Sequence, residues 1–329
     1  MRDYGISVLE QYELHVNSTR RIRGAVLCDT DQGLFLLKES SRQTARIHTV
    51  AEIYTMLKEG GFEMTDYLIP TQAGEYVATA EDGTAYLLKK WYTGRECDIR
   101  KEPELKEAAG TLARIHQILR GGETQAKWEY EGLESEFERH NKELRKVRAF
   151  VRKQSVKGEF EHLFLQSYEQ MYEQAEEALL RLKTANPEVL EEKAEQEGQM
   201  VHGEYNYHNI LIGREGCAVT GFDRARRGVQ LEDLYYFLRK CLEKNRFDER
   251  MGYQIIRSYD GVEPLHRRER EYLAVRLSYP DKFWKIANTY YHSNKAWLPE
   301  KHVEKLRACV SASEEKKRFL RNIFSFHFS

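Results

Sequence analysis

The chain has 329 residues, of which 41% are hydrophobic and 32% are charged. This composition is typical of a soluble globular protein with a hydrophobic core, and it excludes an intrinsically disordered chain. The formal net charge is −1, which gives no electrostatic basis for binding to nucleic acid or to an anionic membrane surface. We therefore expect neither nucleic acid nor membrane among the partners.

The sequence shows neither a targeting signal nor a cysteine motif. No apolar run reaches the roughly 20 residues that cross a bilayer, and the opening residues 1–5 lack the apolar core of a secretory signal. The five cysteines are scattered, and no two have C-x-x-C spacing. We therefore expect a cytoplasmic protein with free thiols, without a disulfide framework or a zinc site, that is not secreted through a signal peptide.

The first 93 residues predict a small lobe of strands around one helix. Between Thr44 and Lys58, apolar residues recur at the spacing of one helix face, and Gly60 and Gly61 end the pattern. Apolar runs bounded by turn residues predict strands on both sides of this helix. The predicted strands span residues 13–16, 25–28, 33–38, 75–80 and 85–91.

After Gly94 the pattern becomes mostly helical. Apolar periodicity predicts helices at residues 104–119, 134–156, 159–182, 231–243, 248–259, 267–277, 281–291 and 299–310. We interpret their many charged residues as solvated faces. Short apolar strands flank a polar loop between Val201 and Phe222. The predicted fold class is α+β with two lobes, a sheet lobe at residues 1–93 and a larger, mainly helical lobe at residues 94–329.

The strongest chemical signal is a set of three short motifs in the second lobe. The loop His-Gly-Glu-Tyr-Asn-Tyr-His-Asn occupies residues 202–209, Gly-Phe-Asp follows at residues 221–223, and Asp233 and Leu234 lie in a predicted helix. The loop resembles the H-G-D-x-x-x-x-N catalytic loop of aminoglycoside phosphotransferases and choline kinases. Residues 221–223 resemble the metal-binding D-[FWL]-[DEG] segment of those enzymes. This resemblance implies a bilobal protein-kinase-like fold, with a catalytic-loop-like segment at residues 201–223.

The resemblance also implies roles for individual residues. Phosphoryl transfer depends on a carboxylate that orients the acceptor hydroxyl, on Mg²⁺ that neutralises phosphate charge, and on a strand Lys that grips the phosphates. By position, Lys38 matches that Lys, and Glu52 on the next helix is its expected partner in the cofactor site. Asn209 matches the metal-ligating Asn, Asp223 matches a second metal-site acid, and Glu204 stands at the position of the catalytic Asp.

Two departures from the family pattern predict impaired catalysis. Glu204 is one methylene longer than Asp, which displaces its carboxylate by roughly 1 Å and costs on the order of 100-fold in rate. Gly221 stands where the family has its first metal-ligating Asp, and it has no side chain. On an extended strand Asp223 would lie about 6.6 Å further along, whereas Mg²⁺ tolerates little displacement of its ligands. Rescue of the metal site by Asp223 is the less favoured alternative.

A third departure lies in the first lobe. Residues 17–24 occupy the place of a phosphate-covering glycine loop, yet they contain one glycine and three arginines. Backbone N–H groups approach phosphate closely where glycines leave room. We favour a solvated hairpin tip here over an anion site.

Structural roles compete with functional ones at several positions. We expect His202 to hydrogen-bond to the backbone, and Asp233 to cap its helix and brace the His202 loop. Lys38 as a solvated strand end and Glu52 as a surface carboxylate remain open alternatives.

Further segments resemble one branch of the superfamily, the CotS-type spore coat proteins of endospore-forming bacteria. These segments are residues 91–97, 235–240, 279–288 and 294–297. The resemblance implies association with the spore coat, other coat proteins as partners, and a location in the mother-cell cytoplasm or in a coat layer. The apolar residues between Phe283 and Ala287 are expected to line the core of the helical lobe rather than a partner groove.

Two functions from different classes remain open at this point. The favoured hypothesis is a pseudokinase-like scaffold or interaction module of the spore coat, for which no cofactor is required. The alternative is an active phosphotransferase that uses ATP and Mg²⁺ to phosphorylate an alcohol group. A sensor that binds a nucleotide or another small molecule without turnover is a weaker third hypothesis.

Overall fold

The computed structural model describes residues 6–22, 24–40, 44–122, 124, 126, 128, 130–293 and 300–328. The chain divides into two compact units, each built from two separate segments. The first unit comprises residues 1–128 and 197–236, and the second comprises residues 129–196 and 237–329. The predicted lobe boundary at residue 93 is a different division and stays a prediction.

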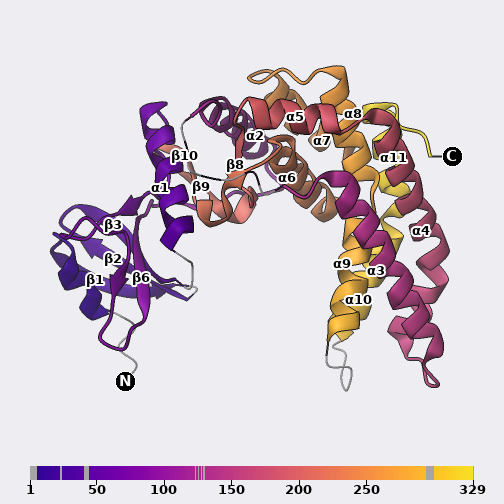
Figure 1. The fold of residues 1–329 in the computed structure, drawn as a ribbon, viewed down its shortest axis with the longest axis horizontal. Coiled ribbons are helices and arrows are strands. Elements are labelled where there is room, and N and C mark those ends of the chain that lie inside the picture. Colours follow the sequence, from indigo (N-terminus) through magenta and orange to yellow (C-terminus); the bar gives the residue numbers. More distant parts are fainter. Residues whose placement is uncertain are drawn as a thin grey trace. The chain divides into compact units, whose positions relative to one another are not determined.

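An antiparallel sheet forms the N-terminal part of the first unit (Figure 1). Its strand order is β1-β2-β3-β6-β4, and β5 pairs with β6. The strands are β1 (Val16–Ile22), β2 (Ala25–Thr30), β3 (Gly33–Glu39), β4 (Leu68–Ile69), β5 (Ala78–Thr79) and β6 (Ala85–Lys90). Because successive side chains of a strand point to opposite faces, Phe35, Leu37 and Leu88 meet on one face. They form a buried cluster there with residues of the short 3-10 helix η1 (Ile6–Gln11).

The first hairpin differs in detail from the prediction. The strand expected at residues 13–16 begins at Val16 and runs to Ile22, so Arg20 and Arg21 lie within a strand paired with β2. Gly24 lies in the turn with a φ of +79°, and Arg23 lies outside the described residues. The hairpin interpretation of this segment is therefore confirmed, but its first two arginines do not lie at the tip. The strand expected at residues 75–80 shrinks to β5, whose two residues pair with the end of a longer strand.

The remaining elements of the first unit surround the predicted catalytic loop. They are α1 (Thr44–Glu59), β7 (Arg95–Glu96), α2 (Glu102–Ile118), β8 (Met200–Val201), η2 (Tyr207–Asn209), β9 (Ile210–Gly213), β10 (Gly216–Val219), η3 (Phe222–Arg224) and β11 (Arg226–Arg227). Strand β9 lies between β10 and β7, and β8 pairs with β11. The two loops with the predicted chemistry are thus held at both ends by short antiparallel ladders.

The second unit is helical. Its helices are α3 (Leu133–Lys153), α4 (Glu159–Ala185), α5 (Glu188–Gln196), α7 (Glu249–Asp260), α8 (Arg267–Ser278), α9 (Asp281–His292), α10 (Glu300–Ser311) and α11 (Ser313–Phe324), while α6 (Leu231–Lys244) begins in the first unit. Phe283, Ile286 and Ala287 are buried in a core cluster with residues of α3, α4 and α10, which confirms their predicted core role. Residues 294–297 of the coat-protein resemblance lie outside the described residues.

The structure also describes the cysteines and the length of the helices. All five cysteines carry free thiols, as expected. Within the described residues, none of the helices combines the length and the apolar character that crossing a membrane requires.

Candidate functional site

Two lysines from neighbouring strands lie on the same face of the sheet. Lys38 and Lys89 belong to β3 and β6, which are adjacent antiparallel strands. Leu37 and Leu88, which precede them in sequence, pack in the cluster on the opposite face, so strand alternation turns both lysine side chains away from that cluster. The side chain of Lys38 is 49% exposed, whereas that of Lys89 is 2% exposed.

Lys89 is the centre of a buried ion network. Its Nζ lies 2.7 Å from Oδ1 of Asp223 and 3.2 Å from Oδ2 of Asp66. The Nζ of Lys38 lies 3.2 Å from Oδ2 of Asp223. Each oxygen of the Asp223 carboxylate therefore has an ammonium partner supplied by the protein itself.

Asp66 links this network to the backbone of the second motif. Its Oδ1 accepts hydrogen bonds from the hydroxyl of Tyr54 at 2.7 Å and from the backbone N–H of Gly221 at 3.0 Å. Both oxygens of Asp66 are thus satisfied, which allows this carboxylate to be buried without an unpaired acceptor.

Opposite charges shift the pKa values of Asp223 and Lys89 in this network. Burial alone would raise the pKa of Asp223, but the charges of Lys89 and Lys38 outweigh it and hold the pKa well below its usual range. Burial alone would lower the pKa of Lys89, but Asp66 and Asp223 outweigh that effect and raise it. The network therefore consists of the buried Asp66 and the partly buried Asp223, neutralised by two lysines.

The predicted catalytic loop is fixed by Asp233, as the sequence suggested, although Asp233 is the third residue of α6 and not its N-cap. The Asp233 carboxylate accepts hydrogen bonds from the backbone N–H of His202 at 2.6 Å and from that of Gly203 at 2.9 Å. Gly203 has a φ of +78°, and a Cβ there would lie 2.3 Å from the carbonyl oxygen of Arg224, so this turn requires glycine. The His202 ring is buried and its Nε2 lies 3.0 Å from the Thr220 carbonyl oxygen. The expected backbone hydrogen bond of His202 is therefore confirmed.

Glu204 and Asn209 lie close together in this loop. The carboxylate of Glu204 is partly exposed and lies 3.4 Å from Nε of Arg224. The Asn209 side chain donates a hydrogen bond from Nδ2 to the backbone carbonyl of Glu204 at 3.0 Å. The Asn209 amide thus braces the loop on which the predicted catalytic carboxylate is carried.

Gly221 lies against the Asn209 amide. A Cβ at Gly221 would lie 3.1 Å from Cγ of Asn209, and Gly221 has a φ of +84°. The two positions that correspond to the family's metal ligands are therefore adjacent, but one of them has no side chain. The expectation of an extended strand here is wrong, because residues 222–224 form the 3-10 turn η3. This turn carries Asp223 toward the two lysines.

Glu52 takes a different partner from the one expected. It lies on α1 and accepts a hydrogen bond from the hydroxyl of Thr124 at 2.6 Å. The structure thus brings Lys38 and Asp223 together and Asn209 next to Gly221, whereas Lys38 and Glu52 engage different groups. The cofactor-binding, catalytic and metal-binding roles of these residues stay predictions.

These residues do not fit an octahedral Mg²⁺. Gly221 offers no side-chain ligand, and both oxygens of Asp223 lie within 3.2 Å of lysine nitrogens. A divalent cation bound to Asp223 would lie beside two ammonium groups, and like charges at this spacing in a partly buried site repel each other strongly. The lysines therefore supply the positive charge that a metal would bring, and no metal-dependent step follows from this arrangement.

Comparison with known proteins identifies the family. The family model described as spore coat putative kinase YutH matches residues 6–323 of the chain. The chain belongs to this family. Spore coat protein S of Bacillus subtilis (strain 168) is 22% identical over 340 residues, in an alignment that covers 95% of this chain and 92% of that protein. The predicted resemblance to CotS-type spore coat proteins is thereby confirmed.

Solved structures define the fold of this spore coat family member. An aminoglycoside phosphotransferase from Alicyclobacillus acidocaldarius subsp. acidocaldarius DSM 446 has a TM-score of 0.87 at 19% identity, covering 96% of this chain and 94% of that chain. The AMP-bound spectinomycin phosphotransferase APH(9)-Ia has a TM-score of 0.62 at 12% identity, covering 94% and 96% of the two chains. These matches establish the predicted α+β, bilobal protein-kinase-like fold.

Lys89 and Asp66 were missed by sequence reasoning. Lys89 ends an apolar strand, where a lysine is usually solvated. The alternation of side chains along the strand was the available signal. Leu87 lies two residues earlier on the same face and is buried, so a buried Lys89 could have been expected. Asp66 lies in an irregular segment between α1 and β4 without any motif, so the sequence offered no signal for it.

A second cluster of potential metal ligands lies in the helical unit. Among the described residues, Glu136, His140 and Asp281 have ligand atoms within 4.8 Å of one another. Arg276 already binds both carboxylates, with nitrogen–oxygen distances of 2.9 Å to Asp281 and 2.9 Å to Glu136. This guanidinium bridges both carboxylates, so the group is an ion-pair cluster.

Proposed function

We propose that this protein is a kinase-fold component of the spore coat whose phosphoryl transfer is impaired, and that it acts as a scaffold or interaction module. The observation that carries the proposal is Gly221. It stands at the position of the family's first metal-ligating acid, and the Asn209 amide packs where a side chain would begin. A glycine has no carboxylate to bind Mg²⁺, and phosphoryl transfer in this superfamily needs that ion to neutralise phosphate charge.

The rest of the site supports the same proposal. Asp223, the acid two positions later in the same motif, is paired with Lys89 and Lys38. Asp66, whose Oδ1 accepts a hydrogen bond from the Gly221 N–H at 3.0 Å, is paired with Lys89. Glu204, at the position of the catalytic Asp, has its longer carboxylate beside Arg224. Each potential active-site carboxylate thus has a cationic partner within the chain, which is the arrangement of a structural site.

Membership of the spore coat family supports the second half of the proposal. We infer that the protein associates with other spore coat proteins, either in the mother-cell cytoplasm or in a coat layer. For this role the kinase fold would supply a rigid body for protein contacts, and no cofactor would be required.

An active phosphotransferase is the second candidate function. The observation in its favour is that Nζ of Lys38 lies 3.2 Å from Oδ2 of Asp223. A Lys that binds the nucleotide phosphates is expected on this strand, and a metal-site acid is expected in this turn. A similar solved structure, spectinomycin phosphotransferase, is an AMP-bound complex. In this case ATP and Mg²⁺ would be the cofactors and a small-molecule alcohol the acceptor.

Thermal melting with nucleotide and metal distinguishes the two candidates. A ligand at 100 times its dissociation constant stabilises a protein by about 2.7 kcal/mol, which is readily seen in the melting temperature. We expect ATP with Mg²⁺ to shift the melting temperature no more than ATP with EDTA. A metal-dependent shift, together with ADP release that Glu204→Ala abolishes, would refute impaired catalysis.

Localisation in sporulating cells tests the scaffold role directly. A fluorescent fusion of the full chain should reach the forespore surface, and Glu204→Ala and Asp223→Asn fusions should do the same if the protein works by contacts. Loss of localisation in a folded Glu204→Ala variant would favour a role that depends on chemistry.

A further inference from the structure

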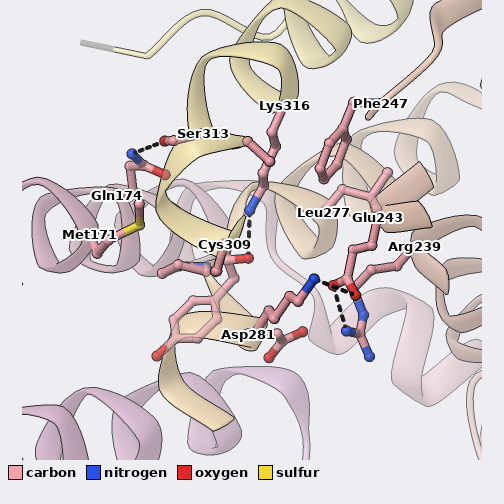
Figure 2. A pocket seen from close by; sticks show the side chains of 14 residues that line it. Met171, Gln174, Arg239, Glu243, Phe247, Leu277, Asp281, Cys309, Ser313 and Lys316 are labelled. Atoms are coloured by element: carbon pink, nitrogen blue, oxygen red, sulfur yellow. Dashed lines mark hydrogen bonds and ion pairs between the residues drawn. The ribbon is translucent and has the colours of Figure 1, made fainter. Parts of the chain in front are cut away.

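The helical unit contains a pocket that is separate from the candidate site described above. Fourteen residues from α4, α6, the α6–α7 loop, the α8–α9 junction and the α10–α11 junction line it (Figure 2). Its volume is about 50 Å³, whereas one water needs roughly 10–15 Å³. The pocket therefore has room for a small polyatomic ion but not for a sugar or a nucleotide.

Lys316 places a cation without a carboxylate partner in this pocket. Its Nζ donates hydrogen bonds to the carbonyl of Ser278 at 2.9 Å and to that of Tyr279 at 2.8 Å. These carbonyls lie at the end of α8, so the lysine closes that helix end. Among the ion pairs of the described residues, none includes Lys316. Lys316 is partly buried, and a positive charge withdrawn from water without a counter-ion is costly unless an anion neutralises it.

The neighbouring charges leave this excess in place. Lys282 and Arg239 share one carboxylate, that of Glu243, at 3.7 Å and 2.9 Å respectively. The Asp281 carboxylate binds Arg276, which does not line the pocket, at 2.9 Å. The positive charge of the two lysines that face the pocket is therefore not fully balanced by the neighbouring carboxylates.

Two helix starts add to the positive potential. The N-cap residues of α9 and α11 are Pro280 and Ala312, both of which line the pocket. Neither makes a side-chain capping hydrogen bond. The first N–H groups of a helix and its dipole favour an anion at that end. Asp281 in the first turn of α9 and Glu314 and Glu315 in the first turn of α11 offset part of these two dipoles, so the positive potential of the pocket comes mainly from its lysines.

We propose that this pocket is a binding site for a small oxyanion such as inorganic phosphate, with Lys316 as its main cationic ligand. Apolar neighbours such as Met171, Phe247 and Leu277 exclude water from one side of the pocket, which strengthens the attraction between ion and lysine. The inference is independent of the proposed function, because it rests on residues of the other unit.

Proton uptake gives the site a specific signature. Burial lowers the pKa of Lys316 to about 8, so at pH 8 about half of these amines are neutral in the free protein. The charged and titratable groups that face this amine are Asp281, Cys309, Glu243, Arg239 and Lys282. A bound oxyanion favours the ammonium form, and binding at pH 8 should therefore take up about half a proton.

Calorimetric titration of the full chain tests the site. Phosphate and sulfate are titrated at pH 8 in two buffers that differ in ionisation enthalpy, and sulfate isolates the proton taken up by the protein because it does not titrate there. We expect saturable one-to-one binding, with a heat that depends on the buffer. Lys316→Met should weaken binding by at least about tenfold, because it removes the main charge. Lys317→Met should leave binding unchanged, since Lys317 pairs with Glu314 and does not line the pocket.

The same titrations can overturn the proposal. Absence of heat in the wild type would mean that Lys316 only closes the end of α8, and equal affinity of the wild type and Lys316→Met would reveal an adventitious ion only. If circular dichroism shows that Lys316→Met is unfolded, Lys282→Ala decides instead, because Lys282 lies at the pocket and is 34% exposed. Unchanged affinity in that folded variant would count against the site.

Discussion

The Nζ of Lys89 lies 2.7 Å from Oδ1 of Asp223, which joins the last long strand of the sheet to the turn after the catalytic-loop-like segment. The two residues are 134 positions apart in the sequence. Lys89 is almost fully buried and also contacts Asp66 at 3.2 Å, so this one cation holds two acids that come from different parts of the first unit.

Replacing Lys89 should therefore destabilise the protein strongly. Lys89→Met keeps the length of the side chain but leaves Asp66 and Asp223 without their shared cation, and breaking a buried pair in this way costs about 3–5 kcal/mol. Lys38→Met is the matched control, because it removes the 49% exposed partner of the same Asp223 and should cost about 0–1 kcal/mol. Urea unfolding measures both. Equal losses in the two variants would mean that burial of the pair does not matter.

Restoring an acid at Gly221 should create a response to metal. Gly221→Asp places a carboxylate beside Asn209, so Mg²⁺ should raise the melting temperature of this variant more than that of the wild type. Gly61→Asp is the control, because Gly61 also has a left-handed backbone, with a φ of +79°, but has no neighbouring atom within 4 Å of its Cβ position. Both variants should lose about 1–2 kcal/mol from the left-handed backbone. An identical Mg²⁺ response in all three proteins would contradict the role assigned to Gly221.

Removal of the Asp233 carboxylate should loosen the catalytic-loop-like segment. Asp233→Ala leaves the buried N–H groups of His202 and Gly203 without acceptors, at a cost of about 2–5 kcal/mol. Asp82→Ala, at an exposed turn where the carboxylate accepts from the Thr84 N–H, should change the urea midpoint little.

The pH dependence of this loss follows from the Asp233 pKa. Burial alone would raise that pKa, but His116 and the hydrogen bond from His202 outweigh it and lower it. The contribution of Asp233 is therefore fully present above the unfolded value of about 3.9 and is lost as the pH falls through the lower folded value. In urea titrations, the difference in free energy of unfolding between wild type and Asp233→Ala should stay constant from pH 8 to 5. It should shrink below pH 4.

His140 should make the helical unit sensitive to mild acid. Burial lowers its pKa to about 4 in the folded protein, against about 6.5 in the unfolded chain. Between these pH values the folded state binds fewer protons than the unfolded chain. The free energy of unfolding is therefore highest above pH 6.5 and falls by about 3 kcal/mol as the pH approaches 4. The ring stacks on Trp284 at 3.4 Å, so tryptophan fluorescence can follow the unfolding.

A pair of variants checks this assignment. His140→Phe keeps the ring but cannot take up a proton, so its urea midpoint should vary less between pH 7 and 4.5 than that of the wild type. His162→Phe replaces an exposed residue of α4 and should follow the wild type. A His140→Phe variant with the full acid sensitivity would assign the effect to other groups.

The helices were predictable wherever apolar periodicity was strong. Helix α1 was expected at residues 44–58 and spans Thr44–Glu59, because its apolar stripe and the terminal glycines agree. Helix α5 was missed, since it buries a single residue, Ala194, and its charged sequence carries no stripe. Helix α11 lay beyond the last predicted element, although it buries Phe319 and Leu320. The short strand β5 depends on tertiary pairing, which local sequence does not encode.

The candidate site shows the limit of motif reasoning more clearly. The motifs located Glu204, Asn209, Gly221 and Asp223, because a family pattern fixes their spacing. They did not predict the partner of Asp223, because Lys89 reaches it only when the sheet and η3 come together in three dimensions. The left-handed backbone at Gly221 was equally hidden, and it replaces the extended strand that the spacing had suggested.

Each compact unit is assembled from two stretches of chain, and the boundary between residues 236 and 237 falls inside α6. During synthesis, the first unit cannot be completed until the ribosome has delivered residue 236, by which time the entire inner stretch of the second unit has already emerged. A truncation near residue 128 or 196 would therefore leave incomplete units. Separate expression of either unit would require a circular permutation or a linker that joins its two segments.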